Sequence, residues 1–144
     1  MNGYLVDTNI PSELTRLKPE PRVAAFLRQA AQERLYVSTL TFGEICNGIG
    51  KLRPEAAAKR LSLQLWLDTV MRPWFAGRIL AVTAPIAERW GFLSAEAKNR
   101  GRTLPVIDGL IAATALEHEL ALVTRNEKNF VGLGVSLLNP WEAG

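Results

Sequence analysis

Short β-rich apolar runs alternate with helical segments along this chain, and this alternation constrains its fold more than any other feature. Runs typical of short buried strands occur at residues 3–6, 35–38, 78–82, 120–124 and 135–138. Segments with helical character lie between them, at residues 22–32, around Glu44, and at residues 55–71, 85–99 and 108–119. Such alternation is typical of a parallel sheet with helices on both faces. We therefore predict an α/β fold with a central parallel sheet of four to five strands flanked by helices.

The length and composition indicate an ordinary globular chain. A length of 144 residues suits one domain with a substantial core. Hydrophobic residues make up 48% and charged residues 22%, and we find no internal repeat or linker. We therefore expect a single domain over residues 1–144. The net charge of +3 is compatible with a polyanionic partner but does not by itself indicate one.

Nothing in the sequence indicates a membrane or an oxidising compartment. Asp7 comes too early in the chain for a signal peptide, and no apolar run is long enough to span a bilayer. Cys46 is the only cysteine, so no internal disulfide can form, and we expect it to be a small buried apolar residue. These features predict a soluble cytoplasmic protein.

Three acidic residues that are far apart in sequence share one local setting. Asp7 ends the apolar run in GYLVDTNI, Glu44 lies on a helix that follows a strand, and Asp108 opens a helix in LPVIDGLIAATAL. Asn126, in LALVTRNEKNF, stands where the pattern invites a fourth acid. The carboxyl ends of the strands in an open α/β sheet meet at one edge, so we expect these side chains to gather there. Gathered carboxylates repel one another, and a divalent cation is the simplest compensation.

Each of the three acids also has a purely structural interpretation. Asp7 fits a turn or a helix cap, Glu44 fits an exposed helix face, and Asp108 fits the first turn of a helix, where the helix dipole favours an acid. Helix caps alone do not require the apolar surroundings that the three acids share. Taken together, the three therefore favour a common site.

A cluster of carboxylates indicates a particular chemistry. Mg²⁺ and Mn²⁺ prefer hard oxygen ligands, and a water bound to such an ion is acidified and can attack phosphorus. Phosphodiester cleavage at such a site needs no His, Ser or Cys nucleophile. The single histidine, His118, lies late in an amphipathic helix, where we expect a structural or solvated role. The sequence has no His/Cys cluster suited to zinc and no Ser–His–Asp grouping.

Two further segments each allow two interpretations. The basic residues Lys98, Arg100 and Arg102 form either a solvated turn or a set of RNA phosphate contacts beside the acidic site, which would be salt-sensitive. The helix at residues 55–71 is apolar around much of its surface, including Trp66. Such a helix is buried on more than one side or packs on a partner.

The motifs LVDTNIPSEL, TLTFGEICNGI, PVIDGLIAATAL and LVTRNEKNF, in this order, resemble those of PIN-domain proteins and, more narrowly, of VapC-type ribonuclease toxins of type II toxin–antitoxin systems. The resemblance covers nearly the whole chain, and RPWFAGRIL and the closing NPW are similar to the FitB-like branch. It implies a Rossmann-like sheet and a Mg²⁺- or Mn²⁺-dependent endoribonuclease that is neutralised by a cognate VapB-like antitoxin. It also implies a homodimer that reaches operator DNA only through the antitoxin.

The same resemblance implies roles for individual residues. The matching motifs place Asp7, Glu44 and Asp108 as catalytic metal ligands. The resemblance also implies that Thr8 and Thr124 supply hydroxyls near the metal.

The resemblance also singles out a departure from the family pattern. The fourth acid of the family falls at the position of Asn126, or a few residues later at that of Asn129, and both are Asn here. An amide can ligate a metal through its oxygen or hold a water, but it brings no charge. We include Asn126 as the fourth member of the catalytic site. We expect one tightly held ion, with a second recruited by the substrate phosphate.

Two alternative functions stay open on the sequence alone. The missing fourth carboxylate also fits a weakly active or inactive PIN protein whose main role is antitoxin-mediated binding of operator DNA and transcriptional autoregulation. Cleavage of DNA, or maturation of nucleic acid, would use the same metal chemistry. The sequence offers no identifiable reader of the RNA 2′-hydroxyl that would separate these substrates.

Overall fold

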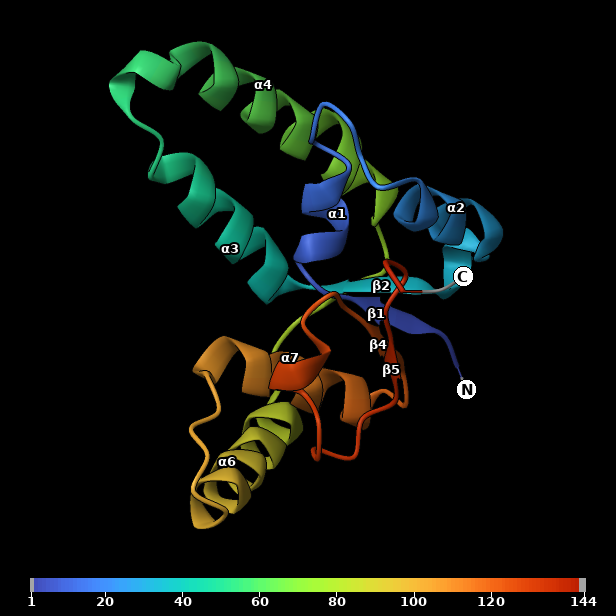
Figure 1. Ribbon diagram of the computed structural model, residues 1–144, viewed down its shortest axis with the longest axis vertical. Coiled ribbons are helices and arrows are strands. Elements are labelled where there is room, and N and C mark those ends of the chain that lie inside the picture. Colours follow the sequence, from blue (N-terminus) through green and yellow to red (C-terminus); the bar gives the residue numbers. More distant parts are fainter. Residues whose placement is uncertain (1, 143–144) are drawn as a thin grey trace.

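A computed structural model describes residues 2–142 and contains a five-stranded sheet in which all neighbouring strands are parallel (Figure 1). Met1, Ala143 and Gly144, the ends of the domain predicted over residues 1–144, lie outside the described residues. The strand order is β3-β2-β1-β4-β5. The strands are β1 (Tyr4–Val6), β2 (Leu35–Ser38), β3 (Ile79–Leu80), β4 (Ala121–Val123) and β5 (Leu137–Leu138). The predicted α/β architecture with a parallel sheet is confirmed.

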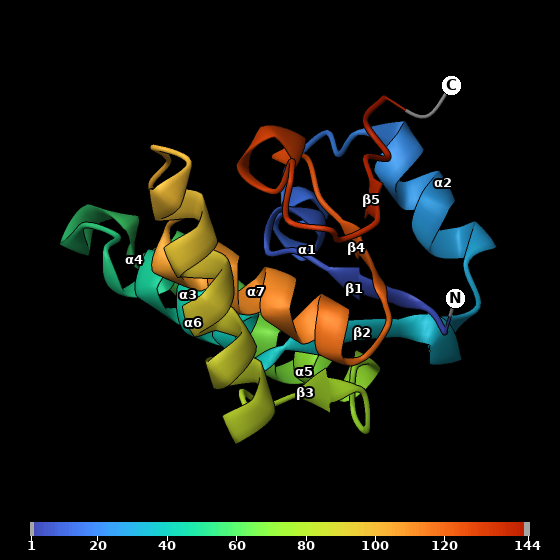
Figure 2. The same cartoon turned by 90° about the horizontal axis from the view of Figure 1, so that it is seen from below.

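Helices connect the strands and cover both faces of the sheet. The α-helices are α1 (Asn9–Glu13), α2 (Pro21–Gln29), α3 (Thr39–Gly50), α4 (Ala57–Trp66), α5 (Arg72–Trp74), α6 (Ala84–Asn99) and α7 (Val106–Glu117). Single turns of 3-10 helix are η1 (Gln32–Arg34), η2 (Pro54–Ala56) and η4 (Glu127–Asn129), and a π-helical turn is η3 (Leu67–Met71). Helices α1 to α4 lie above the sheet in Figure 1, whereas α6 and α7 cover the face that is nearest in Figure 2.

Each face of the sheet has its own apolar core. Successive side chains of a strand point to opposite faces, so Leu5 joins the core with α6 and α7, whereas Val6 joins the core with α1 to α5. Both residues are almost completely buried, at 0% and 1% exposure. The strands therefore read as continuous apolar runs, as expected for a sheet that is covered on both sides.

The central strand β1 is where the direction of the chain through the sheet reverses. From β1 the chain moves to β2 and β3 on one side, and it later returns to β4 and β5 on the other side. Val6 at the end of β1 pairs with Val37 of β2 and with Val123 of β4. The next residue, Asp7, therefore lies at the topological switch point, where open α/β sheets bind their ligands.

Several elements are shorter than the sequence predicts. The strands expected at residues 78–82 and 135–138 contain only two residues each. Both are edge strands, which have hydrogen-bonding partners on one side alone. The helix expected at residues 55–71 is divided into η2, α4 and η3, and the helix expected at residues 22–32 ends at Gln29 because Ala30 is extended.

Two further observations concern the surface. The prediction that Cys46 is buried is wrong, because α3 presents this residue to solvent. The expectation for His118 agrees with its exposed position at the end of α7. Within residues 2–142, no helix combines the length and the apolar character needed to cross a membrane.

Candidate active site

Asp7 is a buried carboxylate at the carboxyl end of β1. It is only 5% exposed, and its backbone N–H donates to Val123 O at 2.9 Å. Its side chain accepts hydrogen bonds from Thr8 N at 2.8 Å, Thr124 Oγ1 at 2.8 Å and Asn9 Nδ2 at 3.3 Å. Burial raises the pKa of Asp7 above its ordinary value, and the three hydrogen bonds lower it in part. The negative charge of Asp7 is therefore costly until a cation or a proton neutralises it.

Helix α3 carries Glu44 to the same edge of the sheet. The helix starts directly after β2, where Ser38 Oγ accepts a hydrogen bond from Leu40 N at 3.0 Å and caps its first turn. Thr8 Oγ1 donates to Glu44 Oε1 at 2.5 Å and lies 3.1 Å from Oγ1 of the buried Thr41. The hydroxyl of Thr8 thus ties Glu44 to the end of β1.

Asp108 lies in the first turn of α7, where the helix dipole favours a negative charge. Gly109, the next residue, brings α7 close to α6, because a Cβ atom at this position would lie 2.7 Å from Trp90 Cδ1. The side-chain amide of Asn129 donates to Asp108 Oδ2 at 3.2 Å. The position of this carboxylate therefore depends on α6 and on the loop between β4 and β5.

The charges of the other two acids act on Asp108. Burial is the largest cause that raises the pKa of Asp108, and the charges of Asp7 and Glu44 raise it further, while the hydrogen bond from Asn129 lowers it. The three acids therefore share one region of uncompensated negative charge.

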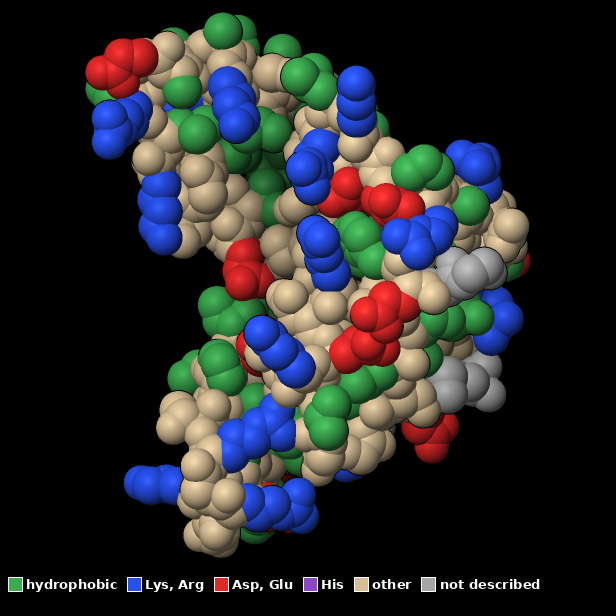
Figure 3. Space-filling view, in the orientation of Figure 1, with side chains coloured by type: hydrophobic (Ala, Val, Ile, Leu, Met, Phe, Trp, Pro, Cys, Tyr) green, Lys and Arg blue, Asp and Glu red, His purple; other side chains and the backbone are tan. Residues whose placement is uncertain are grey.

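Figure 3 shows a hollow at the left edge of the molecule, between the lobe of α3 and α4 and the lobe of α6 and α7. Acidic side chains lie at its inner end, and Lys and Arg side chains lie on both lobes.

The loop after β4 brings Asn129, and not Asn126, to the acidic region. The 3-10 turn η4 reverses the chain, so that Asn129 reaches Asp108. Asn126 lies one turn earlier and is exposed, and its backbone N–H donates to Thr124 Oγ1 at 3.0 Å. A direct role for the Asn126 side chain stays a prediction.

Two of the three basic residues predicted beside the site contact backbone oxygens. Arg100 Nη1 donates to Gly132 O at 3.3 Å, and Arg102 donates to three carbonyl oxygens within residues 128–131. Lys98 is exposed in the last turn of α6. Phosphate contacts by these three residues stay predictions, and Lys98 and Arg100 are the two of them that are exposed.

Two polar residues of the site were not anticipated from the sequence. Asn9 Nδ2 lies 3.3 Å from Asp7 Oδ2 and 3.4 Å from Thr124 Oγ1, and Asn9 Oδ1 accepts from Arg125 N at 3.2 Å. Asn9 thus links the ends of β1 and β4. The position of Asn9, close after a buried strand, is the sequence feature that could have identified it as a site residue. Thr41, which is completely buried, gave no such signal, because its role appears only when α3 packs beside Thr8.

The family model described as "PIN domain" matches residues 4–133. The chain belongs to the PIN-domain family. This PIN-domain chain is 36% identical over 137 residues to Toxin FitB of Neisseria gonorrhoeae, covering 95% of this chain and 97% of FitB. It is 33% identical over 138 residues to VapC ribonuclease Y4jK of Sinorhizobium fredii, covering 96% and 97% of the two chains. The solved structure of FitAB bound to an IR36 DNA fragment matches it with a TM-score of 0.89 and 34% identity, covering 98% of this chain and 97% of the matched chain.

The match to the PIN domain spans every residue of the candidate site, from Asp7 to Asn129. The similarity to FitB and to a VapC ribonuclease extends over nearly the whole chain, so the resemblance predicted from the motifs is confirmed. The Rossmann-like sheet that this resemblance implies is confirmed by the strand order and by the match to FitAB.

The donor set of this PIN-domain site suits a hard divalent cation, although the carboxylates do not form a closed cage. Carboxylate, hydroxyl and amide oxygens are ligands that such ions prefer. Within residues 2–142, no three His, Cys, Asp or Glu side chains converge closely enough to hold an ion by themselves. An ion that keeps several waters fits an open arrangement of this kind, because water bridges the gaps to the carboxylates. PIN-domain ribonucleases generally use a divalent metal ion, and the residues here fit a hydrated one.

Proposed function

We propose that this PIN-domain protein is the toxin of a toxin–antitoxin pair and acts as a metal-dependent endoribonuclease that hydrolyses RNA phosphodiester bonds. The observation that carries the proposal is the placement of Asp7 and Glu44 at one edge of the sheet, where Thr8 donates to both side chains, with Asp108 near enough for their charges to raise its pKa. Three carboxylates that repel one another at a sheet switch point favour a cation site. The names of two similar proteins, a toxin and a ribonuclease, support the same function.

In this proposal the side chains of the site have distinct tasks. The cation, when bound, supplies an acidified water and stabilises negative charge on the phosphate. Asp7, Glu44 and Asp108 are the residues that hold it. Thr124 fixes Asp7 through the hydrogen bond to Oδ2, and Thr8 fixes Glu44 through the hydrogen bond to Oε1. The two hydroxyls orient the carboxylates before binding, so these side chains lose little conformational freedom when the ion and the substrate bind.

We propose Mg²⁺ as the cofactor, with Mn²⁺ as a substitute. Both ions accept hard oxygen ligands, and an open site lets them keep waters. Asn126 and Asn129 bring no charge, so three carboxylates are available to balance the ion. One ion is held by the protein, and a second enters with the substrate phosphate.

The proposed antitoxin is a small VapB-like protein. An apolar cavity of about 360 Å³ lies between α1, α2 and the segment that joins α4 to α5, with Leu14, Leu27, Trp66 and Trp74 among its lining residues. This cavity accepts apolar side chains of an antitoxin helix. An antitoxin Arg that entered the hollow would pair with the carboxylates and block the cation. In this proposal operator DNA is reached only through the antitoxin, and the solved complex of FitAB with a DNA fragment supports DNA binding by such a pair.

A second copy of the chain is the other proposed protein partner. Leu61 and Leu65 on α4 are 60% and 53% exposed, which is unusual for two neighbouring leucines on one helix face. A homodimer that packed on α4 would bury them. We also propose that residues 1–144 act as a single domain. A cytoplasmic location of the protein is consistent with an RNA substrate and with a single, unpaired cysteine.

Induced expression in cells that lack the antitoxin tests the proposed function. The wild-type protein is expected to arrest growth and to fragment cellular RNA. Asp7→Asn keeps the size of the side chain but removes its charge, and it should be harmless at equal expression. Normal growth with intact RNA on induction of the wild-type protein would contradict the toxin function.

A second candidate function is an inactive partner of the antitoxin that serves operator binding and autoregulation. The observation that favours it is the presence of Asn at both candidate fourth positions. Equal harmlessness of the wild-type protein and of Asp7→Asn, together with repression of the operator in the presence of antitoxin, would support this function. Parallel assays on RNA and on single-stranded DNA separate ribonuclease from deoxyribonuclease activity.

A further inference from the structure

One buried side chain of the loop between β4 and β5 packs into the core with α6 and α7. Phe130 is 1% exposed and belongs to the core with α6 and α7. The turn that precedes it is closed by hydrogen bonds from Asn129 N to Asn126 O at 3.0 Å and from Phe130 N to Glu127 O at 2.9 Å. These contacts hold the loop against the core. The carbonyl oxygens of the loop that they do not involve need hydrogen-bond donors from another part of the chain.

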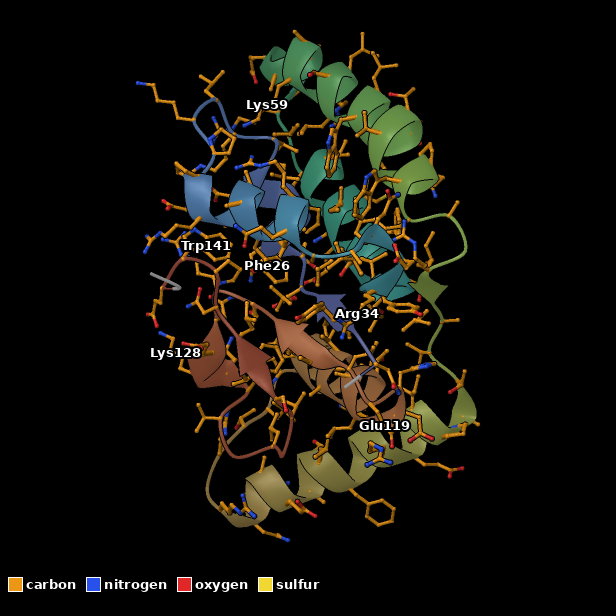
Figure 4. The ribbon with its side chains drawn as sticks, turned by 90° about the vertical axis from the view of Figure 1, so that its right-hand side faces the viewer. Phe26, Arg34, Lys59, Glu119, Lys128 and Trp141 are labelled. Atoms are coloured by element: carbon orange, nitrogen blue, oxygen red, sulfur yellow. The ribbon has the colours of Figure 1, made fainter. Side chains whose placement is uncertain are left out.

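Those carbonyl oxygens accept hydrogen bonds from Arg102. Its Nη2 donates to Asn129 O at 2.6 Å and to Lys128 O at 3.1 Å, and its Nη1 donates to Val131 O. Figure 4 shows Lys128 on this segment, at the edge of the molecule. A guanidinium group presents several donors in one rigid plane, so it can hold three carbonyls in a fixed arrangement.

The backbone of Arg102 is itself fixed by the end of α6. Gly101 has a positive φ of 75°, its N–H donates to Lys98 O at 2.9 Å, and Arg102 N donates to Ala97 O at 2.9 Å. This pair of hydrogen bonds around a left-handed glycine is a Schellman motif, which terminates the helix in a defined geometry. The backbone of Arg102 is therefore held in a fixed position from which its side chain extends to the loop.

One of the three residues whose carbonyl Arg102 holds is Asn129, and the side chain of Asn129 donates to Asp108 Oδ2 at 3.2 Å. We infer that Arg102 is a positioning residue of the metal site: by holding the carbonyl of Asn129, it aims the amide of Asn129 at Asp108. This inference rests on the proposed function, since it assigns Arg102 a task in the site of that reaction. The interpretation of Arg102 as a contact for RNA phosphates stays a separate prediction.

The two interpretations of Arg102 differ in what they predict for charge and for metal. A phosphate contact acts through positive charge, so Arg102→Lys would preserve the contact. Loss of the contact would weaken RNA binding and make that binding less dependent on salt. A clamp acts through the planar fork, so Arg102→Lys fails almost as completely as Arg102→Met. Loss of the clamp weakens the metal site even when no RNA is present.

The test measures the rise in Tm of the purified full-length protein on addition of Mn²⁺, without RNA, alongside kcat and KM for RNA cleavage. Arg102→Met and Arg102→Lys are each expected to weaken Mn²⁺ binding by about 10- to 100-fold, in the range known for groups that orient metal ligands. Lys98→Met removes the same charge nearby and is the matched control. It should leave the Mn²⁺ response unchanged.

A double-mutant cycle shows whether Arg102 acts through Asn129. Asn129→Ala cuts the link to Asp108 while leaving the backbone carbonyl that Arg102 holds, so it should reduce the Mn²⁺ response even if Arg102→Met folds poorly. Adding Arg102→Met to Asn129→Ala should then have little further effect on metal binding. An unchanged Mn²⁺ response in Arg102→Met, or full rescue by Arg102→Lys, would overturn this role while leaving the ribonuclease function intact. Absence of both metal response and cleavage in the wild-type protein would overturn the proposed function itself.

Discussion

The side-chain amide of Asn129 donates a hydrogen bond to Asp108 Oδ2 at 3.2 Å, which brings the loop after β4 to the acidic residues of the candidate site. An amide can donate to a carboxylate, whereas a second carboxylate would repel it. The contact lowers the pKa of Asp108, which burial and the charges of two other acids raise. The candidate site therefore contains three carboxylates, and the amide of Asn129 offsets part of the repulsion that acts on Asp108.

Asn129→Asp should strengthen metal binding and weaken the metal-free fold. A fourth carboxylate beside Asp108 adds a ligand and a charge, and its repulsion is expected to reduce the free energy of unfolding without metal by on the order of 1 kcal/mol. The measurement is the Tm with EDTA and with Mn²⁺, whose difference should widen. Asn126→Asp is the matched control, since Asn126 is exposed and lies one turn away. An equal response of the two variants would contradict the assignment of Asn129.

Asp108→Asn should stabilise the metal-free protein at neutral pH. The pKa of Asp108 is raised in the fold, so its contribution to stability is fully present below about pH 4 and is lost as the pH rises through the folded pKa. The Asp108→Asn variant does not lose this contribution, so its stability relative to the wild-type protein should rise from pH 4 to pH 7. Urea unfolding in EDTA across this range measures the difference. An advantage that shrank with rising pH would contradict the shift.

Thr124→Val should disturb Asp7 without changing the shape of the core. Thr124 is fully buried, and its hydroxyl donates to Asp7 Oδ2 at 2.8 Å. Loss of this donor leaves a buried carboxylate less satisfied, which is expected to cost about 1–3 kcal/mol in unfolding free energy. Thr124→Ser keeps the hydroxyl and should retain cleavage activity. Comparable rates of RNA cleavage in the Val and Ser variants would show that the hydroxyl has no role in the site.

Gly109→Ala should displace Asp108 through the packing of α7 on α6. A Cβ atom at Gly109 would lie 2.7 Å from Trp90 Cδ1 and 3.1 Å from Leu104 Cδ2, so either these side chains or the backbone of α7 must shift. We expect a loss of about 1–3 kcal/mol, as for other overpacked cores, together with weaker Mn²⁺ binding. Gly91→Ala on α6, where a Cβ meets nothing within 4 Å, is the control and should be neutral or stabilising.

The sequence allowed the sheet and the acidic positions to be predicted because both depend on local patterns. A parallel strand buried on two faces leaves a continuous apolar run, and the residue after it, such as Asp7, lies at the carboxyl edge by necessity. The short edge strands were overestimated, because β propensity does not show where pairing ends. Cys46 was misplaced because helix α3 is covered on fewer sides than its apolar composition suggests.

The roles of Asn129 and Arg102 could not be read from local patterns. Asn126 follows β4 more closely, and only the 3-10 turn η4 shows that the chain doubles back and presents Asn129 to Asp108. Arg102 stands in a run of basic residues that resembles a solvated turn or a phosphate contact. Its carbonyl partners lie more than 25 residues further along the chain, in a loop that only the fold brings close.

Cleavage of a labelled RNA by purified, antitoxin-free protein tests the central claim most directly. The wild-type protein should cut the RNA with Mg²⁺ or Mn²⁺, stop when EDTA is added, and resume when metal is restored in excess. Asp7→Asn should be slower by about 100-fold or more, because it loses a charged ligand of the ion. Cleavage that persisted in EDTA, or equal rates for the wild-type protein and Asp7→Asn, would contradict a metal site built on these three carboxylates.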